Sequence, residues 1–329
     1  MLKALTFGFL VTFASKAAAV CYGESYIDKL DDEQLSALAV SAADIPFGEG
    51  IVWQARKGNA VMTIVGAIQF YHPRLEPLRA LLVEPLESSK RLLVETTPTQ
   101  QTELAELIKS DPRRILMTDG SSLPEMLDDR TWQALLAETS SRGISAEVAA
   151  RLQPWYLWSL LSVPDCAKDA TGISLRGLDS MLMSEAERLS IPLQSVEPTT
   201  GLLDVLTNIP MQQQADFLTL FMMPDETRQA LYVASMDAYS SLETGMFREL
   251  NRHAMLKNVG DDDAKASEIF DNLETTLLAS RNQNWIPVMT EAAQVDGEIM
   301  VAIGAAHLIG EEGILQLLVD DGWDVTRLP

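Results

Sequence analysis

Histidine, cysteine and basic side chains are scarce in this sequence. Its 329 residues include 3 histidines and 2 cysteines, and 25 lysines and arginines face 47 aspartates and glutamates, for a formal net charge of −22. Such a charge repels the phosphate backbone of nucleic acid and anionic lipid headgroups. Neither is therefore expected as a partner. With 47% hydrophobic residues the chain can still bury a large core, which predicts a globular protein.

Several catalytic motifs are also missing. The chain has no Gly-x-Ser-x-Gly sequence, and this disfavours the nucleophile turn of a serine hydrolase. It has no Walker-type phosphate loop and no His-Glu-x-x-His zinc helix. Any catalysis must therefore come from a different arrangement of side chains.

The first nineteen residues differ from the rest of the chain. Lys3 is followed by a mainly apolar stretch over residues 4–15, and Lys16 by three alanines. This pattern predicts a signal peptide, residues 1–19, that is removed on export to the periplasm or out of the cell. A retained N-terminal anchor is the alternative. The apolar run is shorter than the roughly 20 residues that span a bilayer, and no later segment is long and apolar enough.

Export makes the two cysteines informative, because oxidising compartments favour disulfides. Cys21 and Cys166 are the only pair available. We expect them to form a bond that stabilises the fold by about 3–5 kcal/mol. A lipidated Cys21 is the alternative, although the bulky Val20 before it makes a poor lipoprotein cleavage site. A disulfide also argues against thiol catalysis.

Hydrophobic spacing predicts an α/β fold with a mixed or mostly parallel sheet flanked by helices. Residues 51–56 and 60–69 form a predicted hairpin around a Lys-Gly-Asn turn. Further strands are expected in RLLVET (91–96), PLQSVEP (192–198), WIPVMTEAA (285–293), GEIMVAIGAAHL (297–308) and GWDVTRL (322–328). Residues 201–280 are helical in pattern and no linker divides the chain. We therefore predict one domain over residues 20–329, with a largely helical insert or lobe.

Polar side chains follow four of these strands at the point where each strand leaves the core. They are Gln69, Glu95, Glu197 and His307. Because ligands of open α/β sheets bind at the carboxyl ends of parallel strands, we expect these side chains to meet at one edge. Imidazole, carboxylates and an amide oxygen could together bind a divalent metal, although each residue alone is more typical of a cap or loop. Two of the strands also look alike, since VMTIVGAIQ (61–69) aligns with IMVAIGAAH (299–307).

The C-terminal segment GAAHLIGEEGILQLLVDDGWDVTRL (304–328) resembles the signature of the TraB/GumN family, in which a Gly-x-x-His strand exit precedes Gly-x-x-Gly and a short helix. Other segments resemble the family in the same order, namely VGAIQFYHPR, LLVET, PWY, GLD, VEP and RNQNWIP. The resemblance covers nearly all of the mature chain. It implies a relation to metal-dependent peptidases of the TIKI type, which block a secreted signalling protein, and to bacterial proteins that shut down peptide pheromones.

The family pattern implies a metal or catalytic site made of two Gly-x-x-His histidines and a glutamate. Carried over, these positions fall on Gln69, His307 and Glu95, so the first histidine is replaced by glutamine in this chain. An amide oxygen is a weaker ligand than imidazole for Zn²⁺ or Co²⁺, which predicts a lower metal affinity. His72, three residues later, could supply the missing imidazole or could be an exposed turn residue.

A candidate substrate-binding group comes from RNQNWIP. Arg281 and Asn282 precede the strand expected at 285–293. Arg281 could clamp a carboxylate or phosphate of a ligand, or it could pair with an acidic residue of the chain. We expect Arg281, Asn282 and Glu197 to contact substrate.

Together these observations predict an exported TraB/GumN-type protein that performs metal-assisted hydrolysis of a peptide or small molecule. Glu95 and His307 are the expected metal ligands or acid and base groups, with Gln69 or His72 completing a site for Mn²⁺, Co²⁺ or Zn²⁺. Two other functions stay open. One is a non-catalytic envelope protein that keeps the cleft to bind a ligand or protein. The other is an interaction module that uses the Met-rich helical lobe.

Overall fold

The computed structural model describes residues 20–168, 176–259 and 263–329. The predicted signal peptide, residues 1–19, lies outside these residues. The strands are β1 (Val52–Lys57), β2 (Ala60–Ala67), β3 (Leu92–Val94), β4 (Leu193–Ser195), β5 (Glu298–Gly304) and β6 (Asp324–Arg327). The α-helices are α1 (Asp32–Ala43), α2 (Leu75–Ser88), α3 (Pro98–Ser110), α4 (Leu123–Met126), α5 (Asp129–Ser141), α6 (Ala146–Ala149), α7 (Pro154–Leu161), α8 (Leu178–Leu189), α9 (Gly201–Asn208), α10 (Met211–Leu220), α11 (Asp225–Ser240), α12 (Thr244–Leu256), α13 (Asp263–Glu274), α14 (Ser280–Asp296) and α15 (Ile314–Asp320). The short 3-10 helices are η1 (Tyr26–Lys29), η2 (Pro112–Arg114), η3 (Asp165–Ala167) and η5 (Ala305–His307), and a π-helix, η4 (Thr275–Ala279), joins α13 to α14.

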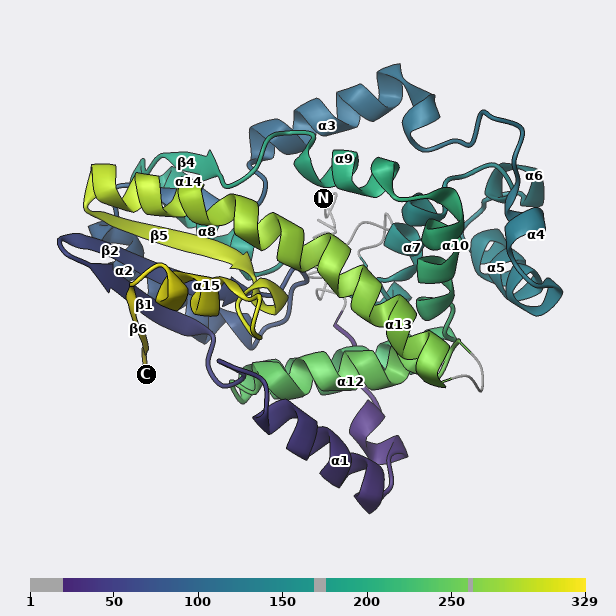
Figure 1. The fold of residues 1–329 in the computed structure, drawn as a ribbon, viewed down its shortest axis with the longest axis horizontal. Coiled ribbons are helices and arrows are strands. Elements are labelled where there is room, and N and C mark those ends of the chain that lie inside the picture. Colours follow the sequence, from purple (N-terminus) through teal and green to yellow (C-terminus); the bar gives the residue numbers. More distant parts are fainter. Residues whose placement is uncertain (1–19, 169–175, 260–262) are drawn as a thin grey trace, which may run out of the picture.

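Six strands within the described residues form one sheet, in the order β4-β3-β5-β2-β1-β6 (Figure 1). β5 pairs in parallel with β2 and β3, and β3 pairs in parallel with β4. β1 is antiparallel to both β2 and β6. The predicted α/β class with a mixed, mostly parallel sheet is confirmed. The carboxyl ends of β4, β3, β5 and β2 consequently lie along one edge.

The predicted hairpin forms β1 and β2, with Lys57 opposite Ala60. Gly58 in the turn has a φ of +61°, a left-handed conformation that glycine adopts without strain. Trp53 and Ala55 are buried along β1, whereas Arg56 is exposed. This alternation places one face of β1 against the core.

β2 and β5 carry the two segments that look alike, and they are neighbours in the sheet. Their register is offset by one residue from the sequence alignment, because Met62 lies opposite Ile299 and Ala67 lies opposite Gly304. Successive side chains of a strand alternate between faces, so residues aligned by sequence face opposite sides of the sheet. Met62 and the aligned Met300 indeed belong to different cores. The ends of β2 and β5 are therefore not equivalent positions.

Helices cover both faces of the sheet. α2 and α8 contribute Leu82 and Leu182 to one core, whereas α14 and α15 contribute Trp285 and Leu315 to the other. Figure 1 shows α14 and α15 in front of the sheet and α2 behind it. Burial on both faces explains why β3 and β5 read as continuous apolar runs.

Helices dominate residues 201–259 and 263–296, so the helical stretch predicted for 201–280 is confirmed and continues to Asp296. The strand predicted at 285–293 is wrong, because these residues belong to α14. Trp285, Met289, Ala292 and Ala293 are buried and recur at the spacing of one helix face. The high apolar content of this segment suggested a strand, but its spacing is helical.

Two further features are a cysteine pair and the character of the helices. The predicted Cys21–Cys166 pair is confirmed at disulfide distance, with the sulfur atoms 2.00 Å apart. This bond connects the start of the described chain to η3. No helix in the described ranges is long and apolar enough to cross a membrane.

Candidate functional site

The guanidinium of Arg281 lies at the centre of a buried cluster at the edge of the sheet. Glu95 follows β3, Glu197 follows β4 and His307 ends η5 after β5, while Arg281 belongs to the first turn of α14. Arg281 Nε and Nη2 donate to the two carboxylate oxygens of Glu197 at 3.0 and 2.8 Å. Nη2 also donates to Glu95 Oε2 at 3.0 Å, and Nη1 contacts the Leu277 oxygen at 3.2 Å and His307 Nε2 at 3.3 Å. These contacts use all of the N–H donors of an arginine side chain.

Asn282 determines which nitrogen of His307 carries the proton. Its Nδ2 donates to the backbone oxygens of His307 and Glu312 at 3.3 and 2.8 Å, which leaves Oδ1 facing His307 Nδ1 at 2.6 Å. Nδ1 must therefore donate, and Nε2 keeps a lone pair that accepts from Arg281. Burial lowers the pKa of His307 to about 4, with Glu95 opposing this shift and Arg281 adding to it. The imidazole is consequently neutral at neutral pH.

Glu95 is held from two sides. Its Oε1 accepts from the N–H of Gly304 at 2.7 Å, and its Oε2 lies between Arg281 and His307 Nε2, the latter 4.0 Å away. Burial by itself raises the pKa of Glu95, but the electrostatic interaction with His307, the charge of Arg281 and the Gly304 N–H together lower it. A Cβ on Gly304 would lie 3.1 Å from Oε1, so the glycine lets the carboxylate approach the strand closely.

Trp285 packs over the cluster one turn beyond Arg281 on α14. The Arg281 guanidinium carbon lies 4.6 Å from its ring, and the His307 ring centroid lies 4.3 Å from it. Its indole N–H donates to Glu197 Oε2 at 3.3 Å. Sequence reasoning missed Trp285 because it assigned this segment to a strand. The four-residue spacing of Arg281 and Trp285 is the signal that places both on one helix face.

The other two predicted metal ligands, Gln69 and His72, lie outside this cluster. Gln69 is exposed beyond β2, and its side chain makes no hydrogen bond with any of the described residues. His72 is buried, accepts from the N–H of Arg74 at 3.1 Å and lines a pocket with Cys21 and Asp237. Burial lowers the pKa of His72, and Arg74 adds to the effect. The structure brings neither side chain into contact with the cluster around Arg281.

Comparison with known proteins supports the resemblance seen in the sequence motifs. The TraB/PrgY/gumN family pattern matches residues 51–327. The chain belongs to the TraB/PrgY/gumN family. It is also similar to "Uncharacterized protein YbaP" of Escherichia coli (strain K12), with 22% identity over 264 residues that cover 79% of this chain and 89% of YbaP. YbaP of Shigella flexneri matches over the same length with the same identity.

The strand-end cluster of this TraB/PrgY/gumN protein does not fit a divalent metal ion. Arg281 contacts the groups that would bind a metal, namely the lone pair of His307 Nε2 and oxygens of Glu95 and Glu197. Its positive charge lies where a metal ion would lie. No three His, Cys, Asp or Glu side chains of the described residues are placed to hold a metal. Two carboxylates, one guanidinium and a neutral imidazole give the cluster a formal charge of −1.

Asp179 is a further acidic group of this TraB/PrgY/gumN chain that sequence reasoning left out of the site. It lies in the first turn of α8, and its Oδ1 is buried without a hydrogen-bond partner in the described structure. Burial raises the pKa of Asp179; the Ser180 N–H opposes the rise and the charge of Glu95 adds to it. The pKa values of Glu95 and Asp179 are thus shifted in opposite directions, as is common at acid–base sites. The GLD segment was the only sequence signal for it.

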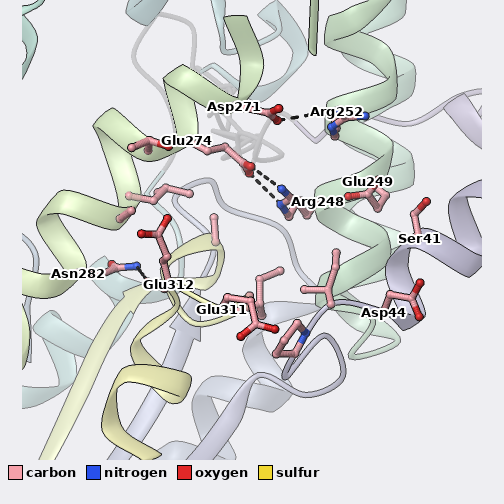
Figure 2. Close-up of a pocket in the computed structure, with 18 residues that line it drawn as sticks. Ser41, Asp44, Arg248, Glu249, Arg252, Asp271, Glu274, Asn282, Glu311 and Glu312 are labelled. Atoms are coloured by element: carbon pink, nitrogen blue, oxygen red, sulfur yellow. Dashed lines mark hydrogen bonds and ion pairs between the residues drawn. The ribbon is translucent and has the colours of Figure 1, made fainter. Parts of the chain in front are cut away.

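Asn282 also lines a pocket of about 640 Å³ (Figure 2). α1 with residues 44–46, α12, α13, η4 and residues 306–312 contribute its other walls. Figure 2 shows Glu274, Glu311 and Glu312 around this pocket, with Glu274 paired to Arg248. The lining has six carboxylates and two guanidinium groups, a formal charge of −4, from Asp44, Glu249, Asp271, Glu274, Glu311, Glu312, Arg248 and Arg252. Such a charge favours a cationic ligand in this member of the TraB/PrgY/gumN family.

Proposed function

We propose that this chain is an exported TraB/GumN-type protein that binds a cationic peptide or small molecule in the pocket beside Asn282, without a resident metal. The observation against a resident metal is the position of Arg281. A metal ion bound by Glu95 and His307 would have to displace a guanidinium that uses all its donors. Displacement would leave a buried charge without its partners, which is costly.

The charges of the pocket support a ligand with ammonium or guanidinium groups. Arg248 pairs with Glu274 and Glu249, and Arg252 approaches Asp271 to 4.0 Å. No ion pair within the described residues involves the remaining pocket carboxylates, those of Asp44, Glu311 and Glu312. Their negative charge is therefore available to a ligand.

The predicted signal peptide and the Cys21–Cys166 pair support a place of action outside the cytoplasm. Oxidising compartments such as the periplasm keep such bonds intact. Mass spectrometry of protein recovered from the cell envelope tests this part. Linked cysteines and an N-terminus near residue 20 are expected, and free thiols on both cysteines would contradict it.

Ligand binding is tested with a peptide library and calorimetry. We expect the wild type to retain lysine-rich peptides in preference to glutamate-rich ones, with an affinity that falls as salt rises. The double variant Glu311→Gln, Glu312→Gln should weaken this binding. The matched pair Glu106→Gln, Glu147→Gln, on surfaces of α3 and α6, should leave it unchanged. Equal retention of both peptide classes would rule out the cationic ligand.

A metal-assisted hydrolase is the second candidate function. The unprotonated Nε2 of His307 favours this function. It lies 4.0 Å from Oε2 of Glu95, at the ends of two parallel strands. This function requires Arg281 to move away from Nε2. Mass spectrometry of library peptides incubated with and without Mn²⁺, Co²⁺ or Zn²⁺ separates the two candidates. Metal-dependent cleavage that is lost in His307→Ala and Glu95→Ala would favour the hydrolase, and retention without cleavage favours the binding protein.

A further inference from the structure

The pocket that His72 lines shares no residue with the cluster around Arg281, and its volume is about 380 Å³. It lies where the start of the described chain meets α11. Tyr22, Val233 and Met236 form the apolar part of its wall. At ~30 Å³ for each molecule of liquid water, it has the room of roughly a dozen waters, enough for an amino acid or a dipeptide.

The imidazole of His72 presents a hydrogen-bond donor to this pocket. His72 is 6% exposed, and its Nδ1 accepts from the N–H of Arg74 at 3.1 Å. Because burial lowers its pKa, the ring is neutral at neutral pH and its proton lies on Nε2. Nε2 has no hydrogen-bond partner among the described residues, yet it is not one of their fully enclosed polar atoms. A ligand in the pocket can therefore reach this N–H.

Opposite charges lie side by side in the same pocket. Arg74 Nη1 donates to Asp237 Oδ1 at 2.5 Å, and both side chains are about half exposed. Nε and Nη2 of Arg74 have no partner in the described chain. Asp28 accepts from the Ser25 N–H at 2.9 Å but forms no ion pair with any described residue. The pocket thus offers guanidinium donors close to carboxylate oxygens.

A ligand with a single charge fits only part of this arrangement. A carboxylate would accept from His72 and Arg74 but would also face the two aspartates of the pocket. An amine would pair with the aspartates and leave the N–H donors unused. A zwitterion satisfies both sets of groups. Its own charges must be close together, because Arg74 and Asp237 are in contact. An α-amino acid has this spacing, since a single carbon separates its ammonium from its carboxylate.

We infer that this pocket binds a free α-amino acid with an apolar side chain. The carboxylate of the ligand accepts from His72 Nε2 and Arg74, and its ammonium group pairs with Asp28 and Asp237. The apolar side chain packs against Met236. This site is independent of the cationic ligand proposed above and of any chemistry at the strand-end cluster.

Methyl NMR of labelled methionines, together with nitrogen NMR of the His72 ring, tests the proposal. Leucine, N-acetylleucine, leucinamide and 6-aminohexanoate are titrated separately, and only leucine has adjacent charges of both signs. We expect leucine to give saturable shifts at the Met236 methyl group and at His72 Nε2. The other three should bind about tenfold more weakly, because each lacks one charged group or its spacing. Met62 and Met289, buried on the other face of the sheet, are internal controls and should not shift.

Two outcomes of these titrations would overturn the proposal. One is the absence of a saturable shift with leucine, which would leave a pocket filled by solvent alone. The other is binding of N-acetylleucine, leucinamide or 6-aminohexanoate as tight as that of leucine, which would show that the pocket does not recognise adjacent opposite charges.

Variants separate recognition of the charged groups from simple packing. His72→Asn keeps an acceptor for the Arg74 N–H but removes the Nε2 donor, and it should weaken leucine binding about tenfold. Arg74→Gln tests the same carboxylate contact should the first variant not fold. Asp28→Asn should weaken binding about threefold. Asp324→Asn, at an exposed position of β6, is its matched control and should have no effect. Unchanged affinity in a folded His72→Asn or Arg74→Gln variant, or equal losses in the two aspartate variants, would contradict the proposal.

Discussion

β2 and β5 are neighbouring parallel strands that end in similar sequences and in different surroundings. After β5, His307 is 4% exposed and contacts Asn282 and Arg281. After β2, Gln69 is exposed and its side chain has no hydrogen-bond partner in the described chain. Similar sequences do not give similar sites here, because β5 leads directly into the 3-10 helix η5 that carries His307, whereas Gln69 lies in irregular chain beyond β2.

The two strand ends are also fixed by different kinds of contact. The end of β5 is held by side chains, chiefly those of Arg281 and Asn282. The end of β2 is held through its backbone: the N–H of Leu178 donates to the Ile68 oxygen at 3.0 Å, and Gly177 approaches the same oxygen closely. Substitution of the side chain should therefore matter at His307 after β5 and have little effect at Gln69 after β2.

The largest expected effect is that of Arg281→Met. The variant leaves Glu95 and Glu197 buried without their common partner, and breaking a buried pair in this way costs about 3–5 kcal/mol. Urea unfolding measures the loss of stability. Arg327→Met is the matched control, since Arg327 pairs with Glu49 on the surface and its removal should cost under about 1 kcal/mol. Similar losses in both variants would show that the cluster has no special role.

The second largest effect is a dependence of the unfolding free energy on pH, which arises because His307 binds a proton less readily in the folded chain than in the unfolded chain. Its pKa of about 4 in the folded state lies below the usual histidine value of 6.5, so the unfolded chain binds the proton more readily between these values. The contribution is fully present above pH 6.5 and is lost as the pH falls to 4, a change of about 3 kcal/mol. His307→Gln should flatten the curve of unfolding free energy over this range. An unchanged slope in the variant would contradict the buried neutral imidazole.

A smaller effect is expected at the backbone contact of β2. A Cβ on Gly177 would lie 1.9 Å from the Ile68 oxygen, so Gly177→Ala must move one of the two segments. We expect a loss of about 1–3 kcal/mol in urea unfolding, as for other overpacked positions. Ser184→Ala, on the exposed side of the same helix, should change stability by less than about 0.5 kcal/mol. A tolerated alanine at 177 would mean that the end of β2 is not fixed through its backbone.

The smallest effect is expected from Gln69→His, which restores the family's histidine. Because the position is exposed, stability should stay within about 0.5 kcal/mol of the wild type, and the new imidazole should titrate near 6.5. Metal affinity should not appear, since Glu95 and His307 keep their contacts with Arg281. Calorimetry with Zn²⁺ checks this. Zinc binding in Gln69→His that disappears on adding His307→Ala would show that the two strand ends can form one site.

Several parts of this comparison could be predicted from local sequence. The hairpin follows from two apolar runs around Gly58, and Glu95, Glu197 and His307 stand out as polar residues directly after apolar strands. The edge where they lie follows from the parallel order of β4, β3 and β5. The pairing of Arg281 with acidic residues was one of two alternatives, and the structure shows that pairing.

Other parts depend on contacts that no local pattern contains. The one-residue offset between β2 and β5 arises only when the strands pair. The exposure of Gln69 belongs to the chain that follows β2, which no apolar pattern describes. The unpartnered oxygen of Asp179 depends on what packs around α8. The strand predicted at 285–293 could have been avoided from the sequence alone, because the four-residue spacing of Trp285 and Met289 already indicated a helix.

Arg281, and not a metal ion, binds the lone pair of His307 Nε2. Nitrogen NMR of the His307 imidazole, recorded at neutral pH with and without Zn²⁺, tests it most directly. We predict a neutral ring with the proton on Nδ1 and an unprotonated Nε2, and no change in either nitrogen shift when Zn²⁺ is added. A shift of Nε2 that saturates with Zn²⁺, and that is absent in Glu95→Ala, would contradict the account.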